Sequence, residues 1–319
     1  MTLSCIKALR MGTRFQAQSG TKGWFMDMNA PRKRIKELEV MVADTIRETP
    51  DTTTLLLFTG NDRLEYQAGH FLTIDPHQFD GLERFIAYFE EIKGKREPPR
   101  AYSLSSAPHD RFLAITVKEE RYTSNVTKYP PLLSPLLVKR MARGMRIEIT
   151  GFTGPYVLAA DIEDRADHLI HVCAGSGIVP NFSILKHSLH EHPKLRHTLV
   201  YSNKTWDDVI FARELHELER LHPDRLRVVH TLTRESPEKL KSPWGDARTG
   251  RVNTALLREL VKDPGACIAF ACGPGITPYD KAAARKTGVQ PAPRFLETAL
   301  ASLKEIGLTE DQLEYESYG

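Results

Sequence analysis

The stretch His168-Leu-Ile-His-Val-Cys-Ala-Gly-Ser-Gly-Ile-Val-Pro180 decides the fold. It opens as an apolar run of strand length, passes through two glycines and leads into a helical pattern at 182–190. Glycines between a strand and a helix let the backbone approach a pyrophosphate, and the helix N-terminus supplies N–H donors and a favourable dipole. The third glycine of the usual dinucleotide fingerprint is missing, so the spacing alone is of moderate specificity. The stretch predicts a nucleotide-binding strand–turn–helix unit.

The chain after this unit alternates between strand and helix patterns. Apolar strand runs are predicted at 197–201, 226–232 and 266–271, and helices at 206–221, 252–261 and 294–306. Strands that alternate with helices indicate a doubly wound parallel α/β sheet.

The chain before this unit contains short β-rich runs with turn residues between them, at 38–43, 52–58, 70–75, 112–117 and 146–150. This pattern is typical of an antiparallel β-barrel. One amphipathic helix interrupts it between Asp80, placed to cap the helix, and Gly94, placed to end it. We expect this helix to cover the barrel surface, and a docking or dimer element is the alternative. Its apolar residues at helical spacing are Leu82, Phe85, Ile86, Phe89 and Ile92.

A chain of 319 residues is long enough for two domains. We predict a tail at 1–35, a barrel domain at 36–160 and an α/β domain at 161–319. The first 26 residues carry four basic and no acidic side chains and lack an apolar signal core, so an organelle transit peptide or an overextended start codon both remain open.

Composition excludes several classes of protein. The 44 Lys and Arg against 41 Asp and Glu give a net charge of +3, too small to indicate a nucleic-acid binder. No apolar run is long enough to span a bilayer, and we expect a cytoplasmic protein. The four cysteines show no paired spacing for zinc or for an iron–sulfur cluster, so we predict no metal; Cys267 is expected to be a buried apolar residue.

Two further motifs carry chemistry. In Arg100-Ala-Tyr-Ser103 an arginine can fork onto a phosphate, a tyrosine ring can lie on a flat heterocycle and a serine can reach a ring nitrogen, which suits a flavin. Ala271-Cys-Gly-Pro-Gly275 ends a strand at the carboxyl edge of the sheet, where open α/β sheets bind ligands. A plain edge strand and a buried thiol before a tight turn are the alternatives.

The order of these motifs, followed by Glu316-Ser-Tyr318, resembles the ferredoxin–NADP reductase superfamily over residues 36–319, and especially the FAD-containing reductase components of bacterial oxygenases without an iron–sulfur domain. The resemblance implies FAD on the barrel and NADPH or NADH on the α/β domain. It also implies that Arg100 contacts a flavin phosphate, Tyr102 stacks on the isoalloxazine ring and Ser103 approaches N5.

The resemblance implies further roles on the α/β domain. Cys272, with Gly273 and Pro274, lies beside the nicotinamide. Glu316 and Ser103 relay a proton near N5, and Tyr318 covers the flavin until the nicotinamide displaces it. The pyrophosphate site is shaped by Gly175, Gly177 and Pro180.

The chain departs from the family pattern at three places. Ser124 and Asn125 match the second flavin element, but the glycine that precedes them is replaced within 121–123. The segments 80–99 and 276–293 are insertions, and we expect the basic residues of the second one to be a solvated face.

The coenzyme preference leans toward NADPH. An NAD-selective site places a carboxylate at the end of its second strand, and Tyr201-Ser202-Asn203-Lys204 has none. Thr233-Arg234-Glu235 is similar to the family segment in which an arginine meets the 2′-phosphate. The alternative is that Arg234 and Lys204 are solvated loop cations.

Three functions remain open at this point: a reductase that serves a separate ferredoxin or oxygenase component, a diaphorase or free-flavin reductase, and a non-enzymatic flavin-binding module. The sequence indicates neither the acceptor nor the oligomeric state.

Overall fold

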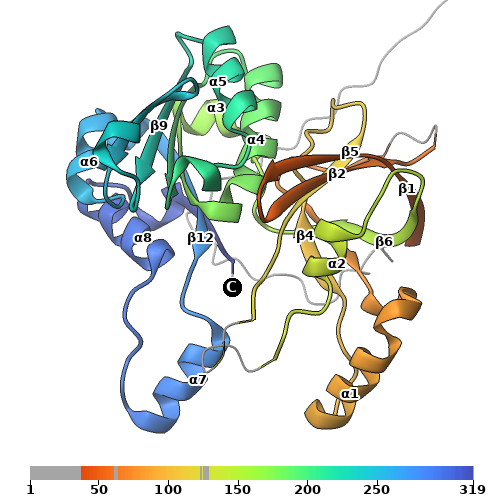
Figure 1. The fold of residues 1–319 in the computed structure, drawn as a ribbon. Coiled ribbons are helices and arrows are strands. Elements are labelled where there is room, and N and C mark those ends of the chain that lie inside the picture. Colours follow the sequence, from red (N-terminus) through yellow and green to blue (C-terminus); the bar gives the residue numbers. More distant parts are fainter. Residues whose placement is uncertain (1–36, 61–63, 123, 125–128, 319) are drawn as a thin grey trace, which may run out of the picture. The chain divides into compact units, whose positions relative to one another are not determined.

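The computed structural model describes residues 37–60, 64–122, 124 and 129–318 (Figure 1). All of them belong to one compact unit, residues 35–319. The predicted tail at 1–35 lies outside the described residues. Within the described part, no helix combines the length and the apolar character needed to cross a bilayer.

The first half of the described chain forms a six-stranded antiparallel sheet in the order β4-β3-β6-β1-β2-β5. A bridge between Leu104 and Ile115 and a 2.9 Å hydrogen bond from the Ser105 amide to the Ala114 carbonyl join the two edge strands. This pairing closes the sheet, as the predicted barrel requires. The strands are β1 (Glu37–Thr49), β2 (Thr52–Phe58), β3 (Phe71–Ile74), β4 (Arg100–Ser103), β5 (Leu113–Lys118) and β6 (Arg146–Thr153).

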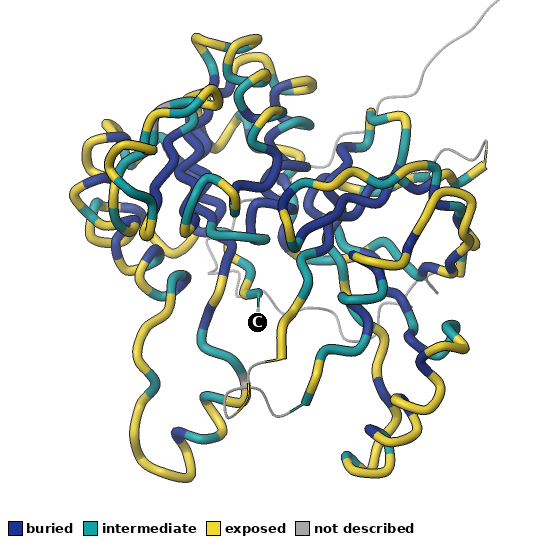
Figure 2. The backbone as a smooth tube through the Cα atoms, in the orientation of Figure 1, coloured by how far each residue is buried: buried dark blue, intermediate teal, exposed yellow. Residues whose placement is uncertain are grey.

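Alternation of side chains explains the barrel core. In β6, Ile147 and Ile149 are buried while Glu148 between them is exposed, because successive strand residues face opposite sides. The same buried face includes Leu55 and Leu57 of β2, and the short helix α2 (Ser134–Lys139) packs Leu137 and Val138 onto it. Figure 2 shows much of β2 as a buried run. The first strand is longer than predicted and turns at 50–51.

The inserted helix is α1 (Glu83–Lys93), preceded by the 3₁₀ turns η1 (Pro76–Gln78) and η2 (Asp80–Leu82). Gly94 ends it in a left-handed conformation with φ +63°, as predicted. The predicted cap at Asp80 is wrong, because Leu82 is the N-cap residue and no side chain caps it. Leu82, just before the helix, and Ile86 in its first turn pack on the barrel core, so the start of the helix contacts the barrel. The predicted apolar face is only partly right, since Phe85 and Ile92 are exposed.

The second half of the described chain forms a sheet in the order β10-β11-β9-β8-β7-β12-β13, parallel except for β10. The chain starts in the middle at β7 and winds both ways, so β7 and β12 form the topological switch point. The predicted doubly wound fold is confirmed. The strands are β7 (His168–Ala174), β8 (Arg196–Asn203), β9 (Leu226–Leu232), β10 (Lys241–Ser242), β11 (Gly245–Thr249), β12 (Cys267–Pro274) and β13 (Leu313–Tyr318).

Helices cover both faces of this sheet. Two of them, α4 (Ile178–Glu191) and α5 (Ala212–Leu221), share one apolar cluster with β8 and β9, while α6 (Thr254–Leu260) and α8 (Phe295–Glu305) share another on the opposite face. The short α3 (Ile162–Arg165) precedes β7. Central strands buried on both faces read as continuous apolar runs, which is why their positions were predictable. The remaining 3₁₀ turns are η3 (Gly175–Gly177), η4 (Trp206–Asp208), η5 (Pro237–Lys239), η6 (Pro264–Ala266) and η7 (Glu310–Gln312).

Two predicted segments differ from the structure. The single helix predicted at 206–221 is broken into η4 and α5, because Phe211 between them takes a left-handed backbone with φ +58°. The insertion at 276–293 contains a helix, α7 (Pro278–Thr287), that the sequence analysis missed. Its basic side chains Lys281, Arg285 and Lys286 are exposed, as expected for a solvated face.

Candidate functional site

The glycine turn after β7 lies against the neighbouring strand β12. A Cβ atom on Gly177 would stand 2.2 Å from the Cys272 carbonyl oxygen, so only glycine permits this approach. Gly175 has φ +53°, and a Cβ there would meet no atom within 4 Å, which leaves room above the turn. The Tyr201 hydroxyl donates a 2.9 Å hydrogen bond to the Gly175 carbonyl. Pro180 is buried in the first turn of α4.

The Asn181 side chain holds this turn through hydrogen bonds. The sequence analysis did not identify this residue. Its Nδ2 donates to the Gly177 carbonyl at 3.1 Å, and its Oδ1 accepts from the Tyr156 hydroxyl at 3.2 Å. Because Oδ1 can only accept, His171 Nδ1, 3.0 Å away, carries the proton of that hydrogen bond. The only sequence feature that could have identified Asn181 is its position one helical turn after Gly177.

Cys272 lies where β7, β12 and β13 run side by side. It is paired in register with Cys173 on one side and Glu316 on the other, and Pro274 pairs with Tyr318. Burial, followed by the nearby Glu316, raises the pKa of the Cys272 thiol well above its usual value. The thiol is therefore neutral at pH 7 and does not act as a thiolate.

Glu316 is a half-buried carboxyl group beside Cys272. Burial raises its pKa to about 7. Its Oε2 is enclosed and has no hydrogen-bond partner among the described residues. A group poised near neutral pH can hold or release a proton, which suits general acid–base work.

The end of β13 meets the flavin-type motif on the barrel. The Tyr318 hydroxyl donates a 2.5 Å hydrogen bond to Ser103 Oγ, across 215 positions of sequence. Gly273 lies against Phe295, whose ring would be 2.6 Å from a Cβ at that position. The structure therefore brings Ser103, Cys272 and the β13 residues of the predicted site together.

Arg100 has a partner that the sequence analysis missed. Its Nη2 donates to Glu97 Oε2 at 2.6 Å, and its Nη1 donates to the Pro98 carbonyl at 2.7 Å. Glu97 is 1% exposed and also pairs with Lys93. Burial alone would raise the pKa of Glu97, but the hydrogen bonds from Lys93 and Arg100 together hold it below the usual range. Tyr102 is half-buried against the barrel core.

The predicted coenzyme-selecting residues lie at the carboxyl ends of β8 and β9. Ser202 is buried, whereas Lys204, Thr233 and Arg234 are exposed. The Arg234 amide donates to the Lys204 carbonyl at 2.8 Å, so the two cations sit on adjoining loops. Neither side chain forms an ion pair within the described part of the chain. Ser124 is exposed in a turn, and Asn125 lies outside the described residues.

The residues present fit a nucleotide at this sheet edge. Asn203 Nδ2 and Thr231 Oγ1, near the carboxyl ends of β8 and β9, are buried without a hydrogen-bond partner among the described residues, as is Glu316 Oε2. Unsatisfied buried polar atoms are costly, and a polar ligand removes that cost. These three atoms and the open space above Gly175 together indicate a ligand-binding site at the carboxyl edge of the sheet.

Comparisons with known proteins agree with this geometry. Residues 171–278 match the oxidoreductase NAD-binding domain family. The ferredoxin reductase component of 3-ketosteroid-9-alpha-monooxygenase from Mycolicibacterium smegmatis is 33% identical over 75% of this chain and 58% of its own length. NADH-cytochrome b5 reductase 2 from Botryotinia fuckeliana is 27% identical over 63% of this chain and 55% of its own length. The chain thus spans less than two thirds of the length of each of these relatives.

Solved structures share the fold. The FAD/NAD-binding domain of nitric oxide dioxygenase from Vibrio cholerae superposes with a TM-score of 0.65 and 22% identity, over 88% of this chain and 98% of that one. The predicted pair of cofactors, FAD and NAD(P)H, agrees with this superfamily. In its fold, in the match of residues 171–278 to the oxidoreductase NAD-binding domain family and in these relatives, the chain is similar to members of the ferredoxin–NADP reductase superfamily.

Proposed function

We propose that the chain is a flavin-dependent oxidoreductase that passes electrons from NAD(P)H through FAD to a separate one-electron acceptor, a ferredoxin or oxygenase component. The observation that carries the proposal is the Tyr318–Ser103 hydrogen bond, which joins the nucleotide sheet to the flavin-type strand beside Cys272 and Glu316. Bound FAD supplies hydride acceptance and one-electron release, chemistry that side chains cannot perform.

The chain's own residues position and protect the reaction in this proposal. Tyr102 presents its ring to the flavin, and Arg100 shifts part of its bonding from Glu97 to a flavin phosphate. Gly175, Gly177 and Pro180 shape the pyrophosphate site, and Gly273 and Pro274 leave space beside the nicotinamide. Ser124 and Asn125 complete the flavin site. Ser103, Cys272, Glu316 and Tyr318 line the place where the two rings meet.

Domain limits and location belong to the same proposal. The FAD-binding domain spans 36–160 and the nicotinamide-binding domain spans 161–319. The cytoplasmic location stays a prediction that cell fractionation tests.

Two variants test flavin binding. Tyr102→Ala and Arg100→Ala should each weaken FAD retention by about tenfold to a hundredfold, because stacking and charge-assisted contacts are worth on the order of 1 to 3 kcal/mol. Tyr88→Ala, at a tyrosine of α1 that is 58% exposed, is the matched control. Absorption spectra and FAD titration of purified protein are the measurements.

The same preparation separates the alternatives. Tightly bound flavin without iron supports the reductase; flavin that is reduced only as a loosely held substrate supports a free-flavin reductase. No flavin bands at any flavin concentration would support a decayed binding module and defeat the proposal.

Coenzyme choice is tested at Arg234. The absence of a carboxylate at 201–204 and the adjoining cations favour NADPH. Arg234→Ala should lower kcat/KM for NADPH about tenfold while changing that for NADH little, since a 2′-phosphate contact is lost. Arg143→Ala, an exposed arginine on the barrel, is the control. A wild-type preference for NADH that Arg234→Ala leaves unaltered contradicts this assignment.

A further inference from the structure

A group of histidines lies where the end of α4 meets the barrel loop between β4 and β5. His187, His190 and Glu191 come from the last two turns of the helix, and His109 comes from the loop. Positions 187, 190 and 191 are separated by steps of three and four residues, so their side chains share one face of the helix. At 1.5 Å per residue, His190 lies about 18 Å along α4 from the glycine turn. The group is therefore separate from the candidate site.

Three of these side chains bring ligand atoms together. The His109 and His190 rings are stacked, with centroids 4.1 Å apart and planes inclined by 14°. His190 Nδ1 lies 2.9 Å from Glu191 Oε1. One nitrogen of each ring and one carboxylate oxygen all lie within 4.8 Å of one another. Bonds of about 2.1 Å to zinc place tetrahedral ligands about 3.4 Å apart, so these exposed side chains need to move by only about an ångström to share one ion.

His187 has a ring nitrogen that no described group satisfies. Its Nδ1 is enclosed and has no hydrogen-bond partner among the described residues. The His187 ring lies beside that of His109, with centroids 6.3 Å apart and planes inclined by 21°. An enclosed polar atom without a partner is costly, and an ion is one of the groups that removes this cost. The ring therefore offers a fourth ligand nitrogen next to the other three side chains.

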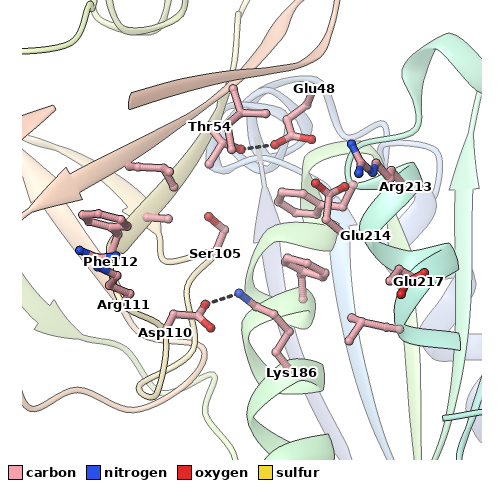
Figure 3. Close-up of a pocket in the computed structure, with 16 residues that line it drawn as sticks. Glu48, Thr54, Ser105, Asp110, Arg111, Phe112, Lys186, Arg213, Glu214 and Glu217 are labelled. Carbon is pink, nitrogen blue, oxygen red and sulfur yellow. Dashed lines mark hydrogen bonds and ion pairs between the residues drawn. The ribbon is translucent and has the colours of Figure 1, made fainter. Parts of the chain in front are cut away.

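The charges around the group favour a cation. Burial lowers the pKa of His109, and apart from His190 the charges that act on this pKa are those of Asp110, Lys186 and Glu191. Lys186 pairs with Asp110, and Figure 3 shows the two side chains pointing toward one another from α4 and from the barrel loop. Asp110 Oδ1 also lies 3.7 Å from His109 Nε2, on the side from which a carboxylate can orient a metal-bound histidine. The helix C-terminus adds a negative partial charge.

We propose that His109, His187, His190 and Glu191 form a site for a divalent transition-metal ion such as zinc. Imidazole nitrogens with one carboxylate oxygen suit zinc, whereas Mg²⁺ and Ca²⁺ prefer sites made of oxygen ligands. The bound ion ties the end of α4 to the barrel loop and therefore joins the two halves of the chain. The sequence analysis predicted no metal because it considered only the cysteines, and this site uses none of them.

Equilibrium dialysis with zinc tests the site on the purified full-length protein, prepared without a polyhistidine tag and freed of metal with EDTA that is then removed. Wild type should take up zinc that an excess of Mg²⁺ does not displace. His109→Gln and His190→Gln should each weaken this binding by at least about tenfold, because even the loss of an outer partner of a metal ligand costs about tenfold to a hundredfold in affinity. Zinc that Mg²⁺ displaces readily would contradict a site built on imidazole ligands.

His216→Gln is the matched control, because His216 also lies on a helix, α5, but its ring contacts Trp244 with centroids 6.3 Å apart. Within the described part of the chain His216 belongs to no group of three metal-binding side chains, so its loss should leave zinc affinity unchanged. Circular dichroism shows whether each variant is folded. Wild-type zinc uptake no greater than that of His109→Gln, or wild-type affinity in both folded His109→Gln and His190→Gln, overturns the proposal whether or not the protein is a reductase.

Discussion

Among the residues of the candidate site, Glu316 has the environment best suited to acid–base chemistry. Its carboxyl group is enclosed beside the Cys272 strand, has no hydrogen-bond partner for Oε2 among the described residues, and has a pKa raised to about 7 by burial. A carboxylic acid in such a place is neutral below pH 7 and becomes charged above it. The residue can therefore hold or accept a proton beside the place proposed for the flavin ring.

The first prediction concerns Glu316→Gln. If the neutral carboxyl group is the active form, wild-type turnover of NADPH with ferricyanide falls as the pH rises through 7. The amide holds its hydrogens at every pH, so the variant should show a flat profile between pH 6 and 8 and roughly tenfold to a hundredfold lower kcat. Glu310→Gln, at an exposed carboxylate, should keep the wild-type profile. A Glu316→Gln profile that retains the step near pH 7 contradicts the assignment.

At the residue scale, motifs predicted the positions that backbone geometry demands. Gly177 was predicted as a glycine that lets the backbone approach a pyrophosphate, and Cys272 because it ends a strand at the sheet edge. The structure adds that a Cβ at Gly177 would clash with the Cys272 carbonyl of β12. Glu97 and Asn181 were not found. Both act through contacts made by folding, with Arg100 three positions away and with a carbonyl in the preceding turn, and an isolated acid or amide carries no such signal.

The helix α1 shows the difference between what a local sequence pattern predicts and what tertiary packing decides. Its apolar spacing predicted the helix and its end at Gly94, but the pattern did not show which apolar residues face the barrel. Ile86 is 4% exposed and belongs to the barrel core, whereas Phe85 is 58% exposed. Adjacent helical positions point about 100° apart, so only one of the two can face the sheet.

The second prediction tests this packing. Ile86→Ala removes buried methyl groups and should lower the free energy of unfolding by about 2 to 4 kcal/mol. Phe85→Ala removes an exposed ring and should change it by less than about 1 kcal/mol. Urea unfolding followed by fluorescence measures both. A larger loss in Phe85→Ala than in Ile86→Ala would show that the other face of α1 packs on the barrel.

Elements with strong apolar periods were predictable, and elements defined by caps or edges were not. The continuous apolar runs of β7 and β12 predicted both strands. The helix α7 begins with a capping box between Thr277 and Asp280. It was not predicted because it has few apolar residues and therefore shows no clear apolar periodicity. The strand β13 has alternating exposure at the sheet edge, and its partner β12 decides its conformation.

At the scale of the whole molecule, the two halves are joined by specific polar contacts. Ser183 Oγ donates to the Ser106 carbonyl at 2.6 Å, Lys186 pairs with Asp110, and Tyr318 reaches Ser103. The sequence predicted both folds but none of these contacts; the family resemblance gave Ser103 and Tyr318 separate roles at the flavin and did not pair them. Contacts between distant segments depend on loop conformations that no local pattern records.

Buried histidines make the stability of the whole molecule depend on pH. His171 and His230 are enclosed in the parallel sheet, and burial lowers the pKa of each to about 4. His171 Nε2 lies 3.4 Å from His197 Nδ1, and His197 Nε2 lies 3.3 Å from Ser188 Oγ. With His171 Nδ1 protonated toward Asn181, its Nε2 can accept from His197 Nδ1 only while the His171 ring is neutral, so a second proton on His171 breaks that contact.

The last prediction is loss of thermal stability in acid. A histidine whose pKa is lower in the folded than in the unfolded state binds its proton more readily when unfolded, so its contribution is complete above pH 6.5 and is lost as the pH falls toward 4. Each such group removes up to about 1.4 kcal/mol per pH unit, or roughly 2 to 4 °C in Tm. His230→Leu should therefore show a shallower fall in Tm between pH 6.5 and 5 than wild type. His190→Gln, at an exposed histidine, should match the wild-type slope, and equal slopes in all three proteins would show that folding does not lower the pKa of His230.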